Sequence, residues 1–283
     1  MQNMNQKLPA LALAVTLTGA LSIGALAGEP ERLISPKPTA CAGAITVNGQ
    51  ALDTAGVPAV SGQGLLPMRL VAESDHGSAA WYEEENTGAF YLDGNVISVD
   101  FATGSVTVND TAAEGVTARV VQGVTFLPAA LLEGLEGYTV EAAEDGLAIT
   151  TPNNAPLVKL AYQIMDASGM GYGMKTDAQG MAETYGLPAD AFEQAVGFFP
   201  MMVSPDTLVL GKLAEGADTQ AVKTALEAYR QSQEDTFSWY LSQNLPKVQD
   251  ARLLVQDGYV LFLIAENADA GEAAFTAALA ALD

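Results

Sequence analysis

Hydrophobic and polar residues alternate in short runs over residues 45–150, and tight-turn signals separate the runs. The dipeptides Asn-Gly at 48–49 and Asp-Gly at 93–94 each stand between two apolar runs, and such dipeptides are strong signals for a two-residue β-hairpin. Gly104 separates two further alternating runs. The pattern therefore predicts that this stretch is mostly β-strand.

One phrase within this stretch occurs twice, as LLPMRLVAES over residues 65–74 and as TFLPAALLEG over residues 125–134. In each copy a proline, Pro67 or Pro128, stands where a helix would begin, because proline fits the first helical turn. Apolar residues follow at helical spacing, and then come a glycine, a strand, an acidic turn and a second strand. We therefore predict a unit of strand, short helix and hairpin that is used in tandem. Its inward positions are Met68, Val71 and Ala72 in the first copy and Leu131, Leu132 and Leu135 in the second.

The segment TPNNAP, residues 151–156, has the composition of a linker, and helical spacing begins beyond it. A helix is predicted over residues 157–169, two strands are predicted within residues 198–213, and the Asp-Gly at 257–258 signals a hairpin. This order of helices and strand pairs predicts an α+β domain with an antiparallel sheet.

A long helix is predicted between the two strand pairs of this domain. Asp218 is its expected N-cap, and the helical pattern continues to about Ser242. A final helix is predicted over residues 270–282. The long helix is expected to turn five side chains inward, namely Val222, Leu226, Phe237, Tyr240 and Leu241.

The tandem unit resembles the copper amine oxidase N-terminal-like domain over about residues 45–151. The resemblance rests on GLLPMRLVAES and WYEEENTGAF, in which a Leu-Pro-x-Arg helix precedes a tryptophan-bearing strand and an acidic turn. The second copy departs from this pattern, because Ala130 stands in the place of Arg69. Glu141 likewise replaces Trp81. The resemblance implies a twisted antiparallel sheet with short helices, which acts as a stalk, spacer or binding module in exported proteins of Gram-positive bacteria. It implies no copper chemistry, which in the oxidase lies outside this module.

The second half of the chain, from Leu157 to about Leu279, is similar to an uncharacterised domain of secreted proteins and lipoproteins from the same bacteria. The similarity rests on VKTALEAYRQSQEDTFSWYLSQNLPKVQDARLLVQDGYVLFLIAENAD, a charged helix that ends in Tyr-Leu and is followed by two strands around a Gly-Tyr turn. No activity is attached to that family, so the similarity implies a location and no mechanism.

Lys7 precedes an uncharged apolar run, residues 8–27, which ends in Ala-Leu-Ala. A basic start, an apolar run and a small-x-small end predict a signal peptide that is cut between Ala27 and Gly28. Two alternatives stay open, namely a retained membrane anchor and a lipid attached to Cys41, the single cysteine. The predicted division of the chain is a signal peptide (1–27), a flexible leader (28–44), the first domain (45–150), the linker (151–156) and the second domain (157–283).

The formal net charge of −22 bears on the partners. So acidic a chain repels the phosphate backbone of nucleic acid and anionic lipid headgroups. We therefore expect no nucleic-acid partner, and no membrane contact beyond the N-terminal segment. A cell-surface protein, a secreted protein or a cell-wall component remains as the partner class.

Arg69 is the one candidate ligand-binding residue. In one interpretation it pairs with Glu73, one helical turn away, or with an acidic turn, and it stabilises the fold as a partly buried ion pair. In the other, its guanidinium holds a carboxylate or phosphate of a ligand. The absence of the arginine from the second copy favours the first interpretation.

Other residue patterns suggest no catalytic or metal site, and we expect no cofactor. His76, the single histidine, is expected to be solvated at a helix end, beside an Asp75 that does not face it. The acidic turn at residues 83–85 lacks the ligand spacing of an EF-hand. Thioethers can bind copper(I), but they also fill cores. The methionines concerned are Met165, Met170, Met174 and Met181.

Two functions of different classes remain. The first is a non-catalytic binding or spacer protein outside the cytoplasmic membrane, at the cell surface or secreted. The second is a hydrolase that uses paired carboxylates in the second domain. A buried carboxylate with a strongly shifted pKa in a deep cleft would favour the hydrolase.

Signal cleavage gives the first testable prediction. Mass spectrometry of the exported protein should find Gly28 as the mature N-terminus, because the small residues before it suit a signal peptidase. A membrane-bound chain that retains residues 8–27, or one that carries a lipid on Cys41, would contradict this prediction.

Overall fold

The computed structural model describes residues 44–58, 60, 64–144, 146–171, 173–200 and 203–280. The predicted signal peptide, its cleavage point at Ala27 and Gly28, the leader before residue 44 and Cys41 lie outside the described residues. Among the helices of the described ranges, none has both the length and the apolar character needed to cross a membrane.

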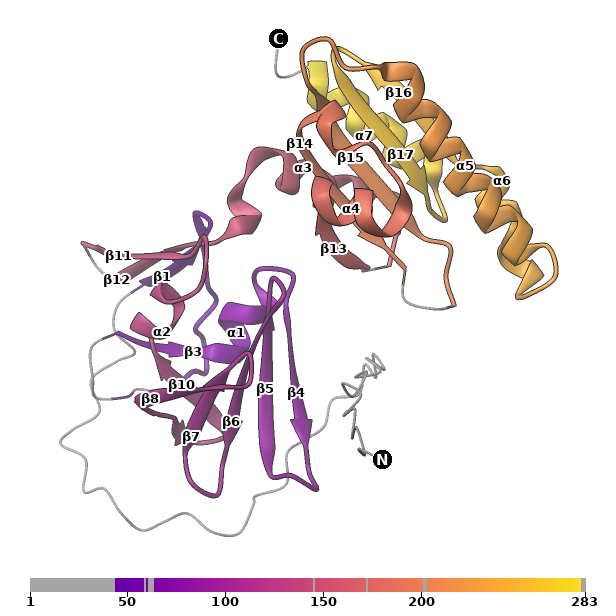
Figure 1. Cartoon of the computed structure of the whole chain (residues 1–283). Helices are drawn as coiled ribbons and strands as arrows, with labels where there is room; N and C mark the ends of the chain where they lie inside the picture. The colour runs from indigo at the N-terminus through magenta and orange to yellow at the C-terminus, as the bar shows by residue number, and fades with distance from the viewer. Residues whose placement is uncertain are drawn as a thin grey trace, which may run out of the picture. The chain divides into compact units, whose positions relative to one another are not determined.

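The first half of the described chain is made of short strands with two short helices (Figure 1). Its strands form a four-stranded, a three-stranded and a five-stranded sheet. The prediction of a mostly β region with short helices is confirmed, although several small sheets replace the single expected one. The elements are β1 (Ala44–Val47), β2 (Gln50–Ala51), β3 (Leu65–Pro67), α1 (Met68–Glu73), β4 (Ser78–Tyr82), β5 (Thr87–Leu92), β6 (Asn95–Asp100), β7 (Ser105–Val108), β8 (Thr111–Thr117), β9 (Arg119–Val121), β10 (Val124–Pro128), α2 (Ala130–Glu133), β11 (Thr139–Ala143) and β12 (Gly146–Thr150).

The two copies of the repeated phrase are paired with each other. Strand β3 of the first copy runs antiparallel to β10 of the second, and Leu66 lies opposite Leu127, the residue that holds the same place in its copy. The pairing therefore relates the two copies by an approximate local two-fold axis. Each strand leads into its helix, and the hairpins β4–β5 and β11–β12 follow the helices as predicted.

The two hairpins then enter different sheets. Strand β5 continues into the sequential sheet β4-β5-β6-β7-β8, whereas β12 pairs with β1 in the order β11-β12-β1-β2. The pairing of β1 with β12 is parallel, which corrects the expectation of a purely antiparallel sheet. The strands approach closely at Gly146, where an added Cβ would overlap the backbone of Ala44. The first and last strands of the module thus hold each other, although about a hundred residues separate them in sequence.

One hydrophobic core serves all three sheets. Met68, Val71 and Ala72 of α1 are fully buried in it, as the helical spacing predicts. In the second copy Leu132 and Leu135 are buried, while Leu131 is partly buried against the same core. The shorter α2 therefore packs less tightly than α1, and it leaves part of one side chain open to a groove.

The second half of the described chain has a five-stranded antiparallel sheet in the order β13-β14-β15-β17-β16. The predicted α+β class is confirmed, and the two strands expected within residues 198–213 are β14 and β15, of which β14 begins earlier than predicted. The elements are η1 (Pro152–Asn154), α3 (Pro156–Ser168), β13 (Met174–Asp177), α4 (Ala178–Tyr185), η2 (Ala189–Ala191), β14 (Phe192–Phe199), β15 (Thr207–Leu213), α5 (Thr219–Phe237), η3 (Ser242–Asn244), α6 (Leu245–Gln249), β16 (Arg252–Gln256), β17 (Tyr259–Ile264) and α7 (Ala268–Ala280).

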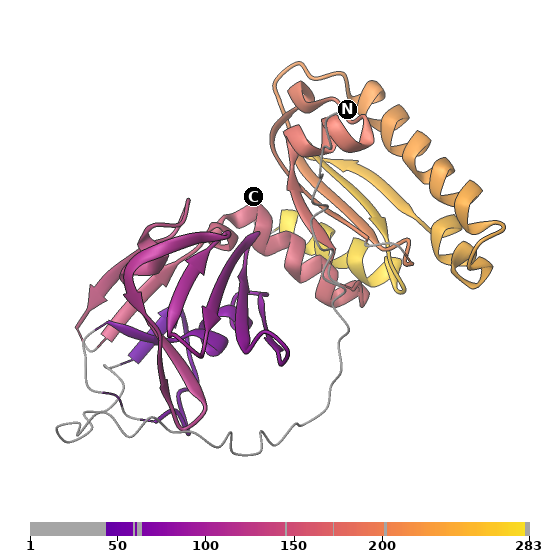
Figure 2. The same ribbon diagram turned by 60° about the horizontal axis from the view of Figure 1, so that its bottom comes forward.

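Both faces of this sheet are buried. Alternate residues of the central strands enter one core with α3 and α7 and another core with α4, α5 and α6. Figure 2 shows the orange α5 on one side of the sheet and the helices α3 and α7 on the other. The sequence of such a strand is a continuous apolar run, because neighbouring side chains point to opposite cores. The run YVLFLI of β17 is an example.

The long helix α5 ends earlier than predicted. Its N-cap is Asp218, whose carboxylate accepts hydrogen bonds from the backbone of the first turn, and Val222, Leu226 and Phe237 point inward as expected. The helix stops at Phe237, however, and Tyr240 is exposed while Leu241 adopts a left-handed φ of 51°. The inward assignment of Tyr240 is therefore wrong, because the helical pattern continues past the point at which the chain turns, whereas Leu241 is partly buried against the core beneath α5.

A buried carboxylate closes the end of the first half. Asp75 is 4% exposed and accepts hydrogen bonds from Asn48 Nδ2 (2.7 Å) and Asn153 Nδ2 (3.1 Å). Asn48 also bonds to the side chain and the backbone of Thr151. Burial raises the pKa of Asp75, against the opposing effect of its hydrogen bonds to Thr151 and Asn153. The segment predicted as a linker thus contains buried side chains and begins with the 3₁₀ helix η1.

Replacement of Asp75 tests this network. Asp75→Asn should lower the free energy of unfolding at neutral pH by about 1–3 kcal/mol, because an amide N–H₂ would face the amide donors of Asn48 or Asn153. Urea unfolding measures the loss. The same change at the exposed Asp166 is the control and should stay within about 0.5 kcal/mol.

The pH dependence of Asp75 has a definite sign. A raised pKa in the folded state means that the folded protein holds this proton more tightly than the unfolded chain does. The stability that protonated Asp75 contributes is therefore fully present below the ordinary pKa of 3.8 and is lost as the pH rises through the folded-state value. The advantage of the wild type over Asp75→Asn should shrink on going from acid to neutral pH, and an advantage that grows would contradict the assignment.

Candidate functional site

Arg69 lies on the exposed side of α1. Its side chain is 55% exposed and its Nη1 lies 3.5 Å from Oε1 of Glu73, which is 48% exposed. The predicted partner is therefore correct, but the expectation of a partly buried pair is wrong, and no acidic turn takes part in this ion pair. Ala130, which holds the same place in α2, is exposed as well. An exposed pair one helical turn apart adds little stability, since water and salt screen it.

His76 and Asp75 have different surroundings. His76 is exposed at the end of α1 with a left-handed φ of 60°, and its ring stacks on Tyr162 with centroids 3.6 Å apart. The adjacent Asp75 is turned into its buried amide network. The exposed helix-end histidine follows the prediction, whereas the buried role of Asp75 was missed. The signal that could have found it is the pair of asparagines, which supply amide donors.

The remaining sequence candidates lie apart from one another. The turn at residues 83–85 is exposed, as predicted. Met165 and Met170 belong to the core beside α3, Met181 belongs to the core on the opposite face of the sheet, and Met174 is exposed. The structure therefore does not gather the four thioethers. Within the described ranges, no group of three or more His, Cys, Asp and Glu side chains is placed to hold a metal ion.

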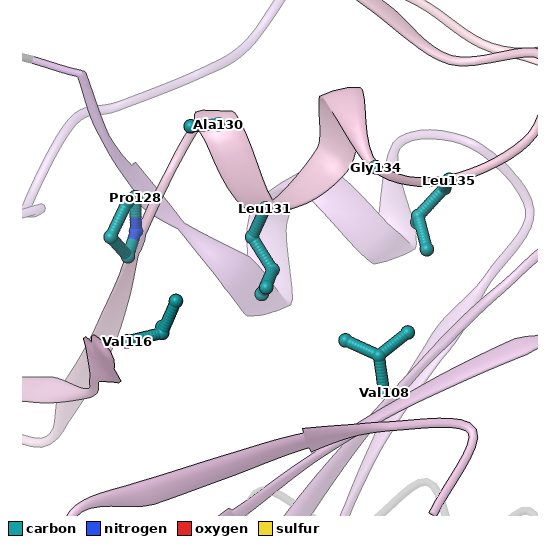
Figure 3. Close-up of a pocket in the computed structure, with 7 residues that line it drawn as sticks. All are labelled: Val108, Val116, Pro128, Ala130, Leu131, Gly134 and Leu135. Atoms are coloured by element: carbon teal, nitrogen blue, oxygen red, sulfur yellow. The ribbon is translucent and has the colours of Figure 1, made fainter. Parts of the chain in front are cut away.

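An apolar groove of about 270 Å³ lies along α2 (Figure 3). Leu131 points into it from the helix, and Val108 and Val116 face it from the strands. The groove exists because α2 is short and leaves Leu131 only partly covered. It contains no charged or hydroxyl side chain that could orient a substrate. Its remaining lining residues are Pro128, Ala130, Gly134 and Leu135.

A second, open groove of about 330 Å³ follows α5. Glu227 is the one carboxylate among its lining residues, and it already accepts from Arg230 at 2.6 Å. Arg230 also pairs with Glu234 at 2.7 Å, and these two carboxylates raise the pKa of the guanidinium. Hydrolysis by paired carboxylates needs two such groups beside one bond, so this groove does not supply the site expected for a hydrolase.

The most unusual surface of the second half lies just beyond the end of α5. Trp239 is 79% exposed and Tyr240 is 45% exposed, and their rings are 6.0 Å apart with an angle of 52° between the planes. Val203, in the loop before β15, is 57% exposed and is tied to the same region by Asn244, whose Nδ2 donates to the Val203 carbonyl at 3.2 Å. We refer to Val203, Trp239 and Tyr240 as the aromatic surface.

The backbone holds these rings outward. Phe237, two residues earlier, is buried and anchors the end of α5 in the core. The chain then turns at Leu241, whose φ of 51° and ψ of 48° are unusual for a large side chain. This turn stops the helix before Trp239 and Tyr240 can rotate onto the sheet. Strained backbone of this kind persists only where the surrounding structure enforces it, and it concentrates at functional sites.

The aromatic surface has a neutral polar surrounding. From Thr236 to Pro246 the chain carries no charged residue, although its net charge is −22. Ser238, Ser242 and Gln243, which are close to the rings in sequence, are exposed. Within the described residues, the indole N–H of Trp239, the hydroxyl of Tyr240 and the side chains of Ser242 and Gln243 make no hydrogen bond to protein groups. The site therefore offers free neutral donors and acceptors around two aromatic rings.

The exposure of the Arg69–Glu73 pair predicts how much stability the protein loses when Arg69 is replaced. Arg69→Ala should lower the free energy of unfolding by no more than about 0.5 kcal/mol, because the pair is exposed. Arg230→Ala is the matched comparison, since it also lies on a helix with a glutamate one turn away but is 21% exposed and pairs with two carboxylates. It should cost more, about 1 kcal/mol. Urea unfolding measures both variants. If Arg69→Ala lowers the free energy of unfolding as much as Arg230→Ala does, the assignment of Arg69 to a weak, exposed ion pair is wrong.

Two families match separate parts of the chain. Residues 46–151 match the model of the copper amine oxidase N-terminal domain, and residues 167–265 match the model of a domain of unknown function, DUF4358. Searches of curated proteins and of solved structures found no match. The first match ends at Thr151, the residue bonded to Asn48, and the second contains the sheet and the aromatic surface. The chain thus matches the copper amine oxidase N-terminal domain in its first half and the domain of unknown function DUF4358 in its second.

Proposed function

We propose that this protein is a non-catalytic binding or spacer protein that works outside the cytoplasmic membrane, at the cell surface or in secreted form. The observation that carries the proposal is the aromatic surface. Two neighbouring large rings face water on a folded domain, and exposed aromatic groups of this kind are typical of recognition surfaces. Trp and Tyr dominate the energetics of such surfaces because each buries a large rigid area with few rotatable bonds.

The first half of the chain supports the spacer part of the proposal. Its three sheets share one core, and its first strand is held by its last. Its repeated helices use their apolar residues for packing, and Arg69 is occupied by Glu73. A self-contained module of this kind can carry a binding domain away from an attachment point.

The location outside the membrane is supported by the N-terminal sequence. A basic residue, an apolar run and an Ala-Leu-Ala end precede the first folded strand. A chain with a single cysteine forms no intrachain disulfide, and its large cores make such a bond unnecessary for stability.

Cell fractionation tests the proposed function. The full chain, expressed in its source bacterium, should appear with the cell wall or in the culture medium, and the purified chain should sediment with isolated cell walls of that bacterium. The retention should persist at high salt, because the proposed surface is uncharged. A cytoplasmic location, or hydrolysis of wall material by the purified chain, would contradict the proposal.

A further inference from the structure

We propose that the aromatic surface formed by Val203, Trp239 and Tyr240 binds a neutral polysaccharide. This inference rests on the proposed function and names the ligand class of its binding surface. Three properties of the surface carry it: the presentation of the two rings, the neutral polar groups around them, and the absence of charge in a strongly acidic chain.

The rings are presented in a way that suits flat, partly apolar ligands. Trp239 and Tyr240 are adjacent in sequence, and their ring planes are inclined by 52°, so the pair forms an open corner and not a closed stack. The faces of a pyranose ring carry aliphatic C–H groups, and these pack well against aromatic faces. Each aromatic ring therefore offers a contact for one sugar unit, and removal of water from both surfaces stabilises the contact.

The polar groups around the rings match sugar hydroxyls. Ser242, Gln243, the Trp239 indole and the Tyr240 hydroxyl supply donors, and all but the indole can also accept. In the described residues none of these four groups is used within the protein. Sugar hydroxyls both donate and accept, so a mixed set of this kind can bond to them without leaving a partner unsatisfied.

The charge around the rings favours a neutral partner. No acidic or basic residue lies between Thr236 and Pro246. Asp235 directly precedes this stretch, is exposed and accepts a hydrogen bond from Gln231 at 2.9 Å. Glu234 accepts from Gln249 and Arg230, which lower its pKa, and Lys247, directly after the stretch, lies 2.9 Å from Asp206. A cationic partner would be attracted to the acidic surface elsewhere on the chain, and an anionic one would be repelled by the net charge of −22. The aromatic surface therefore suits a neutral ligand.

The backbone that carries the two rings is anchored before and after them. Phe237 is buried on one side of the rings, and the left-handed Leu241 lies on the other. Asn244 holds the Val203 loop beside them. An anchored backbone loses less conformational entropy on binding than a flexible one, which favours the weak contacts that neutral sugars make.

The test uses the full mature chain with defined neutral glycans. Cellohexaose and chitohexaose are titrated while tryptophan fluorescence is recorded, and sedimentation with cellulose and chitin covers insoluble forms. The chain has two tryptophans, so Trp81→Phe leaves Trp239 as the single reporter. At least one glycan should change the Trp239 signal or carry the protein into the pellet.

Two variants locate the binding. Trp239→Ala and Tyr240→Ala should each weaken binding by roughly tenfold or more, as expected for residues that carry most of an interface energy. Their thermal midpoints should stay near that of the wild type, because both side chains are largely exposed. Met174→Ala removes another exposed apolar side chain from the same domain, 53% exposed, and should leave binding unchanged.

Several outcomes would overturn this inference. They are no binding to any of these glycans, binding that Trp239→Ala leaves intact, and an aromatic surface that serves another partner. Another partner would be shown by either of two results. The wild type would sediment with phosphatidylcholine vesicles and Trp239→Ala would not, or the wild type would form a dimer in light scattering and Trp239→Ala would not. If glycan binding fails but the chain is exported and retained by cell walls, the proposed function stands and the neutral-polysaccharide assignment falls.

Discussion

The antiparallel pairing of β3 with β10 is the contact on which the first domain depends. It joins the two copies of one sequence phrase so that equivalent leucines, Leu66 and Leu127, lie opposite each other. Neither copy can bury its helix alone, since a short helix on one hairpin leaves most of its apolar face in water. Pairing brings α1 and α2 to one core, and the shared core then carries three sheets. The parallel pair β1–β12 closes the same unit.

The second domain depends on a different constraint, a sheet that is apolar on both faces. Residues of β17 alternate between two cores, so helices must cover each side. Helices α3 and α7 cover one face, and α5 with α4 and α6 covers the other. The length of α5 that the sheet can bury ends at Phe237. Trp239 and Tyr240, just beyond it, face water, which is how a structural helix comes to present the aromatic surface.

Local rules in the sequence were sufficient for much of this fold. The Asx-Gly dipeptides at 48–49, 93–94 and 257–258 form hairpins with the left-handed φ angles that such turns need. Asp218 caps α5, and Gly169 ends α3 with a left-handed φ. Helix α4 was missed, although Asp177 caps it and Gly186 ends it, because its short apolar pattern gives a weak periodic signal. These features could be read from sequence because each depends on neighbours within a few residues.

By itself, the sequence determined the hairpins, the tandem unit, the helix caps, the α+β class and the acidic character of the chain. Only the tertiary structure decided that β1 pairs with β12 in parallel, that Asp75 is buried between Asn48 and Asn153, and that Arg69 stays in water. It also decided that Tyr240, which continues the helical pattern of α5, faces outward. The physical reason is the same in each case. Burial and partner choice depend on groups that lie far apart in sequence, whereas turns, caps and helical periodicity depend on groups that lie side by side.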